Sequence, residues 1–132
     1  MQFSPQTRIT ISCLWTYVGL NMVFADVLSL YTPGTLPQVL EGTVEGVALS
    51  DMLMLVAAAC LQIALVMIVL SQVLPARWCK YANIFAALFT AAFIVGGGSL
   101  KPHYILFASF EIGALLTILA LVLRRPQSEQ AR

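Results

Sequence analysis

The chain has 132 residues, of which 60% are hydrophobic and 10% are charged, with a formal net charge of +1. Soluble globular domains carry about a quarter of their residues as charged side chains, so this composition excludes an ordinary soluble domain. It predicts an integral membrane protein whose main partner is the lipid bilayer. The near-zero net charge leaves no basic face, so we expect no nucleic-acid partner.

Four segments are long and apolar enough to cross a bilayer, whose hydrocarbon core of about 30 Å needs about 20 apolar residues per helix. Their ends carry local signals: Ser50 suits a helix N-cap, Pro75 a stop, and Pro102 the first turn of a helix. We predict an all-α, integral-membrane four-helix bundle in which residues 1–132 form a single domain. The predicted helices cover residues 9–30, 50–74, 78–95 and 102–123.

The first apolar segment also resembles a cleavable signal peptide, with Ala25 as the small residue at the cleavage site. Three polar residues, Thr16, Tyr17 and Asn21, interrupt this segment, and only Arg8 precedes it. We therefore interpret the segment as a helix that the mature protein keeps.

The connection between the first two predicted helices, residues 32–49, is the only long one. Its apolar residues recur at nearly helical spacing, with Glu41 and Glu45 between them. This pattern predicts a short helix at the membrane surface, and a lid over the mouth of the bundle is the alternative. The apolar residues are Leu36, Val39, Leu40, Val44 and Val47.

The basic residues predict the orientation. With four spans, both termini and the connection between the second and third helices lie on one side of the membrane. That side carries six of the seven basic residues, and the other side carries Lys101 alone. The positive-inside rule then places both termini in the cytoplasm and argues against a dual-topology transporter. The six residues are Arg8, Arg77, Lys80, Arg124, Arg125 and Arg132.

Asp26 and Glu111 are the most informative residues, because each interrupts an apolar span. An ionisable group in the bilayer interior costs several kcal/mol and is retained where it is paired, solvated or used. At 1.5 Å per residue, Asp26 lies about 6–8 Å and Glu111 about 13–15 Å below the outer boundary. The two acids predict a site for a proton, a cation or a small amphiphile. The alternatives are that Asp26 is solvated from the interface and that Glu111 links helices through Asn21 or Gln62.

Other polar residues lie at similar depths. Asn21 and Gln62 are near the midplane, and His103 and Tyr104 are near the outer mouth. Tyr104 and Glu111 share one helix face, at an offset of seven residues. His103 is the only histidine, so we expect no haem cofactor and no metal site. His103 is either a proton gate or a solvated interfacial side chain.

Catalytic motifs are missing from the sequence. Ser71 and Ser109 have no nearby basic partner, no glycine-rich phosphate motif is present, and the three cysteines form no Cys-x-x-Cys pair. An enzyme is therefore disfavoured, although a membrane-embedded enzyme acting on a lipid-like substrate through buried acids stays among the alternatives.

Small residues recur on three of the helices, which favours close helix packing within one bundle or between two copies of the chain. A homodimer or a larger membrane complex is therefore a candidate assembly. We also interpret Asn83 as a helix–helix contact, and Trp15 and Trp78 as anchors at the cytoplasmic interface. The small residues are Ala57, Ala64 and Ser71; Ala82, Ala86 and Thr90; and Ser109, Gly113 and Thr117.

Several short motifs give the chain a family resemblance. They are Asn21–Leu30 (NMVFADVLSL) with Pro33-Gly34, Leu70-Ser71 with Leu74, Trp78 with Ala82-Asn83-Ile84, and Phe110-Glu111-Ile112. With these motifs the chain resembles a family of small bacterial four-helix membrane proteins of unassigned function. The resemblance implies a stand-alone inner-membrane bundle and transfers no activity. The hypotheses are therefore a binding or transport protein, a non-catalytic scaffold protein, and the enzyme named above.

Overall fold

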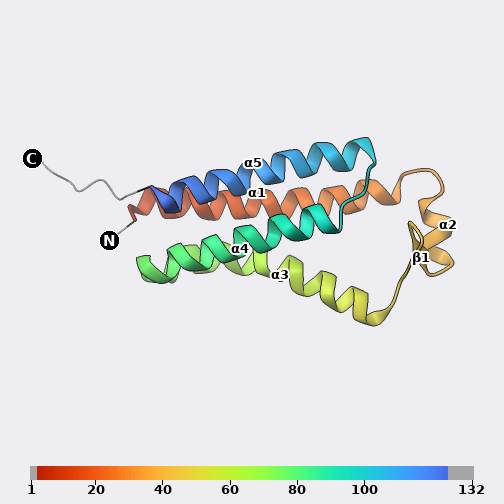
Figure 1. Cartoon of the computed structure of the whole chain (residues 1–132), viewed down its shortest axis with the longest axis horizontal. Helices are drawn as coiled ribbons and strands as arrows, with labels where there is room; N and C mark the ends of the chain where they lie inside the picture. The colour runs from red at the N-terminus through yellow and green to blue at the C-terminus, as the bar shows by residue number, and fades with distance from the viewer. Residues whose placement is uncertain (1–2, 125–132) are drawn as a thin grey trace, which may run out of the picture.

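Four long helices build the molecule, and the computed structural model describes residues 3–124 (Figure 1). All four are long and apolar enough to cross a membrane, so the predicted all-α four-helix class is confirmed. The first helix begins earlier than predicted, because Ser4 caps it and accepts a hydrogen bond from the Thr7 amide. The helices are α1 (Pro5–Leu30), α3 (Asp51–Val73), α4 (Ala76–Gly96) and α5 (Pro102–Leu123).

The helices form an antiparallel ring in the order α1, α3, α4, α5, in which α1 and α4 lie diagonally opposite. Figure 1 shows the N-terminus and the α3–α4 connection at one end, here called the terminal end. The opposite end, here called the hairpin end, carries the segment between α1 and α3 and the α4–α5 connection. Arg125 and Arg132, used above to predict the orientation, lie outside the described residues.

Packing is tight in the terminal half of the bundle and loose in the hairpin half of α3. The largest fully buried side chains include Trp15, Ile11, Leu115 and Ile118, from α1 and α5. In contrast, residues 51–59 of α3 are exposed apart from half-buried Ala57, and Figure 1 shows this part of α3 diverging from α4. More than two turns of α3 therefore lack a neighbour within the described part of the chain.

The segment between α1 and α3 folds as a short helix and a hairpin. It contains α2 (Thr35–Leu40), β1 (Thr43–Val44) and β2 (Val47–Ala48), with the two strands antiparallel. The predicted short helix is present as α2, but it ends at Leu40, and Val44 and Val47 lie in the hairpin strands instead. Gly42 adopts φ +79°, and the two loop residues Glu45 and Gly46 adopt φ +50° and +81°. Positive φ at both positions is typical of a tight two-residue hairpin turn, which no α-helix can contain.

A buried polar network links three helices near the terminal end. The Trp15 Nε1–H donates to Asn83 Oδ1 at 2.7 Å, across the diagonal of the ring, and the Ser71 hydroxyl donates to the same oxygen at 3.3 Å. Asn83 Nδ2 donates to the Cys79 carbonyl at 2.8 Å. Asn83 is therefore the helix–helix contact that was predicted. Trp15 is 0% exposed, so its prediction as an interface anchor was wrong: its indole N–H has a partner inside the bundle. Trp78 is exposed.

Arg8 fastens the end of α3 to α1. Its guanidinium donates to the carbonyls of Ser71 and Gln72 at 3.1 and 2.9 Å. These carbonyls belong to the last turn of α3, where the helix itself offers no donor. The Ser12 hydroxyl donates to the Ile68 carbonyl at 2.8 Å. The terminal half of the bundle is thus held by directional bonds as well as by apolar packing.

Candidate functional site

Glu111 lies on the core-facing stripe of α5. The buried residues of this helix are Glu111, Ala114, Leu115, Ile118 and Val122, a spacing that follows one helix face. Glu111 is 3% exposed, its Oε1 atom is enclosed without a hydrogen-bond partner, and neither carboxyl oxygen accepts a hydrogen bond from residues 3–124. It lies nine residues after the first residue of α5, or about 13 Å along the axis. A carboxyl therefore occupies a position that otherwise suits a leucine.

Asp26 is the second acid of this region. It lies four residues before the end of α1, the helix beside α5, and its side chain is exposed. Asp26 is close enough to Glu111 to act on its carboxyl electrostatically. Among residues 3–124 no basic side chain forms an ion pair with either acid. The structure thus brings an enclosed and an exposed carboxyl together without a compensating cation.

Tyr104 and His103 lie between this pair and the hairpin end. Tyr104 is half-buried and within electrostatic range of Asp26 and Glu111. His103 Nε2 lies 3.1 Å from the Ser29 hydroxyl, which donates its hydrogen to the Ala25 carbonyl at 2.8 Å. A hydroxyl has one hydrogen to donate, so His103 is the donor in its bond to Ser29. His103 therefore ties α5 to α1 instead of being merely solvated.

Two of the predicted site residues lie elsewhere. Asn21 Nδ2 donates to the Tyr17 carbonyl of its own helix at 2.8 Å. Gln62 is exposed and lines a groove between α3 and α4. Neither side chain bonds to Glu111, so the interpretation of Glu111 as a helix link through Asn21 or Gln62 was wrong. Asp26, Glu111 and Tyr104 lie within electrostatic range of one another, and His103 bonds to Ser29 of α1. Neither amide bonds to any of these four side chains.

Comparison with known proteins places the chain in a family. A family model described as "Family of unknown function (DUF6326)" matches residues 1–131. The chain belongs to this family. No curated protein and no solved structure matches the chain. The resemblance to a family of small proteins without an assigned function is thereby confirmed. Any activity of this family member has to be argued from its own residues.

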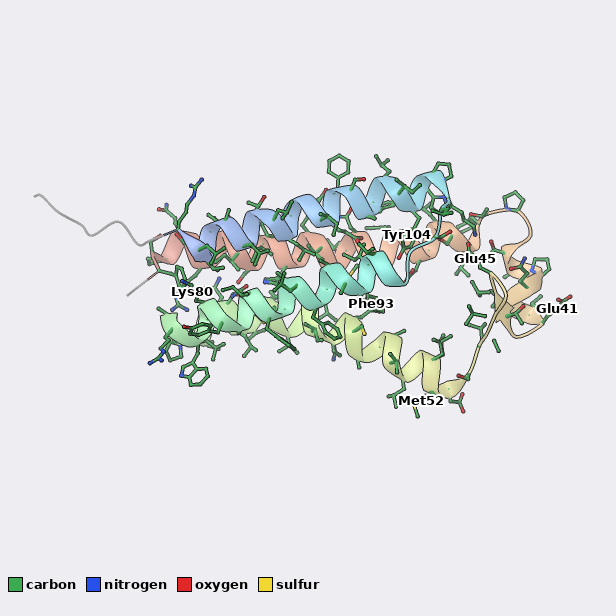
Figure 2. All side chains as sticks on the ribbon, viewed as in Figure 1. Glu41, Glu45, Met52, Lys80, Phe93 and Tyr104 are labelled. Atoms are coloured by element: carbon green, nitrogen blue, oxygen red, sulfur yellow. The ribbon has the colours of Figure 1, made fainter. Side chains whose placement is uncertain are left out.

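The hairpin of this family member is tethered beside the acid pair, a contact that sequence reasoning missed. Lys101 Nζ lies 3.2 Å from Glu45 Oε1 and donates to Thr35 Oγ1 at 3.2 Å, and the Ser99 hydroxyl donates to Glu45 Oε1 at 2.8 Å. Figure 2 shows Glu45 and Tyr104 near one another at the hairpin end. The isolated Lys101 on a side otherwise without basic residues was the available signal, since Glu45 is an obvious partner for it.

The ion pair between Lys101 and Glu45 should weaken at low pH. The hydrogen bond from Ser99 and then the interaction with Lys101 lower the pKa of Glu45 below its ordinary value of 4.5. Its stabilising contribution is therefore complete above about pH 4.5 and is lost as the pH falls through the folded-state pKa. An exposed ion pair contributes at most about 1 kcal/mol, so we expect partial loosening of the hairpin at pH 3.5 relative to pH 6.

Spin labels can measure this loosening. Leu40→Cys and Leu100→Cys place labels on exposed residues of the hairpin segment and the α4–α5 connection, with Cys13→Ser removing the exposed native thiol. The distance distribution between the labels should broaden at the lower pH. In Lys101→Met it should already be broad at pH 6. Identical distributions for all of these samples would show that the ion pair does not hold the hairpin.

Within residues 3–124, no three His, Cys, Asp or Glu side chains come together to hold a metal ion. The candidate site itself offers two carboxyls, a phenol and an imidazole. Such groups bind and pass protons or bind a small cation, and they include no nucleophile that is activated by a neighbouring base.

Proposed function

We propose that this chain is a four-span membrane protein that binds a proton or a small monovalent cation at Glu111 and transports it through the bundle. The enclosed Glu111 carboxyl carries this proposal: within residues 3–124 it has neither a hydrogen-bond donor nor a basic partner, and a second acid lies within electrostatic range. A bare carboxylate in an apolar interior costs far more than a neutral one. A bound proton or cation removes this cost with a ligand small enough for a packed bundle.

Asp26 serves as the receiving group in this proposal. It is exposed near the hairpin end of α1, whereas Glu111 lies deeper. A proton that reaches Asp26 from the hairpin end can pass to Glu111 directly or through an intervening water. Tyr104, within range of both carboxyls, is placed to assist by hydrogen bonding.

The proposal also includes an orientation. Arg8, Arg77, Lys80 and Arg124 lie near the terminal end, whereas Lys101 lies at the hairpin end. The positive-inside rule then places the termini in the cytoplasm and the acid pair toward the outside of a bacterial inner membrane. The hairpin held by Lys101 lies at the same end of the bundle as the acid pair.

Flux into liposomes tests the function. The purified protein is reconstituted with a pH-sensitive dye inside the vesicles, and a potassium diffusion potential drives cations inward. We expect the wild-type protein to acidify the lumen faster than empty vesicles, and Glu111→Gln to reduce the rate to that of empty vesicles. Asp51→Asn is the matched control, because Asp51 is an exposed acid at the hairpin end of α3.

Two results would refute this proposal. One is a wild-type protein that moves neither protons nor sodium or potassium ions faster than empty vesicles. The other is a Glu111→Gln variant with wild-type flux. A flux that both Glu111→Gln and Asp51→Asn reduce equally would point to general damage instead of a site at Glu111, and would also count against the proposal.

A non-catalytic scaffold is the second candidate, favoured by one observation. Ser109, Gly113 and Thr117 are exposed along α5, and a methyl group added at Gly113 would meet no atom within 4 Å. This stripe of small residues therefore lies outside the bundle, where a helix of another protein can approach closely. A scaffold role predicts that Gly113→Leu abolishes complex formation and that Glu111→Gln leaves it intact.

A further inference from the structure

A lateral groove runs between α3 and α4 on the outside of the bundle. Its volume is about 330 Å³. Its lining includes Ala59, Gln62 and Val66 from α3, and Ala82 and Phe85 from α4. Of all its lining residues, Gln62 alone has a polar side chain. The groove faces away from the acid pair and is no part of the site described above.

Gln62 lies at the centre of its span. It is eleven residues from Asp51 and eleven from Val73, the two ends of α3, or about 16 Å from each along the axis. Its side chain is exposed and makes no hydrogen bond with any side chain or backbone group of residues 3–124. A glutamine side chain is too short to reach either membrane interface from this depth, and the acyl chains of lipids offer neither donor nor acceptor.

Contact with lipid acyl chains explains the apolar lining of the groove, but it does not explain the Gln62 amide. An amide in the hydrocarbon region requires a polar partner that hydrocarbon does not supply. A primary amide carries both a donor and an acceptor. Two identical amides can therefore satisfy each other with reciprocal hydrogen bonds.

We propose that the groove binds a second copy of this chain in a two-fold symmetric dimer in which the two Gln62 side chains hydrogen-bond to each other. Copies inserted in the same orientation are related by an axis along the membrane normal, which keeps each residue at the depth of its equivalent. When α3 of each copy lies next to this two-fold axis, Gln62 of one copy faces Gln62 of the other, as in an isologous interface. This inference is independent of the proposed transport function.

The surroundings of Gln62 fit this arrangement. Ala59 and Ala82 have small side chains, so the backbone of another helix can approach the groove closely. Residues 51–59 of α3, which lack neighbours in the bundle, continue from the groove toward the hairpin end and extend the surface available to the second copy.

The α5 stripe makes a weaker case for a dimer. The Ser109 hydroxyl donates to the Ile105 carbonyl at 2.7 Å, and the Thr117 hydroxyl donates to the Gly113 carbonyl at 2.8 Å. Both hydroxyls are thus satisfied within their own helix. No polar group of this face needs a partner, in contrast to Gln62.

Energy transfer between labelled copies in liposomes tests the dimer. Donor- and acceptor-labelled proteins are mixed at increasing dilution in lipid to obtain the dissociation constant. Gln62→Leu should raise this constant by about 3- to 30-fold, the range expected for one polar contact between membrane helices. Ala59→Phe, which fills the groove, should raise it further. Gly113→Leu, on the opposite face and with open space around it, should leave it unchanged.

Thiol cross-linking adds a direct readout of the contact. With Cys13 replaced by serine, Gln62→Cys should form a covalent dimer under mild oxidation in the membrane, and Gly113→Cys should not. A chain that stays monomeric at every protein density would overturn the proposal. So would a dimer that Gly113→Leu weakens and Gln62→Leu leaves unchanged, because that result would assign the interface to α5.

Discussion

Replacing Glu111 with leucine is expected to stabilise the bundle by about 1–3 kcal/mol, the usual cost of a buried polar group without a partner. The side chain is 3% exposed, its Oε1 atom has no hydrogen-bond partner, and its neighbours on the buried face of α5 include Ala114 and Leu115. Leucine has nearly the same volume and removes the polar atoms. A variant that gains stability and loses transport would show a residue that is kept for function although it lowers the stability of the fold.

The measurement is the free energy of unfolding in mixed micelles as the denaturing detergent is increased. Glu111→Gln serves as the control, because it removes the ionisable group and keeps an amide that needs partners. We expect its stability to lie between the wild type and Glu111→Leu. A clear loss of stability in Glu111→Leu would show that the carboxyl makes a stabilising contact, and the proposed function would lose the observation that supports it.

The same substitution at Asn83 is expected to have the opposite effect. Asn83→Leu should destabilise the bundle by about 2–6 kcal/mol, because two buried donors lose their acceptor at about 1–3 kcal/mol each. These donors are the Trp15 indole and the Ser71 hydroxyl, at 2.7 and 3.3 Å from Asn83 Oδ1. Trp15, Asn83 and Ser71 are all 0% exposed, so water cannot replace the lost bonds.

A double-mutant cycle with Trp15→Phe isolates the bond across the ring diagonal. Phenylalanine keeps an aromatic ring at residue 15 but removes the N–H donor. If the bond contributes to stability, the double variant Trp15→Phe/Asn83→Leu should lose less stability than the sum of the single variants. Strict additivity would mean that the two side chains act independently and that the 2.7 Å contact contributes nothing.

Much of the fold is determined by local features of the sequence. Apolar length sets the number of spans, and Ser50, Pro75 and Pro102 set helix ends close to those observed for α3, α4 and α5. The depth of Asp26 and Glu111 also follows from the sequence, because depth is the residue count from a helix end multiplied by a constant rise. These properties do not depend on which helices become neighbours.

The direction in which each side chain points was decided by the tertiary structure. In water, an apolar stripe identifies the buried face of a helix, but a membrane helix is apolar on its lipid face and its core face alike. The sequence therefore could not tell that Gln62 points outward, that Glu111 points inward, or that the stripe at Gly113 lies outside the bundle.

The long-range partner of Trp15 was equally invisible in the sequence. Trp15 is buried because Asn83, 68 residues later, offers an acceptor. Composition and helix-end signals of the sequence determined a bundle of four helices apolar enough to cross a membrane, with two acids at known distances from the helix ends. Only the packing of the helices decided which of its polar groups found partners, because a hydrogen bond depends on distance and direction in space and not on separation along the chain.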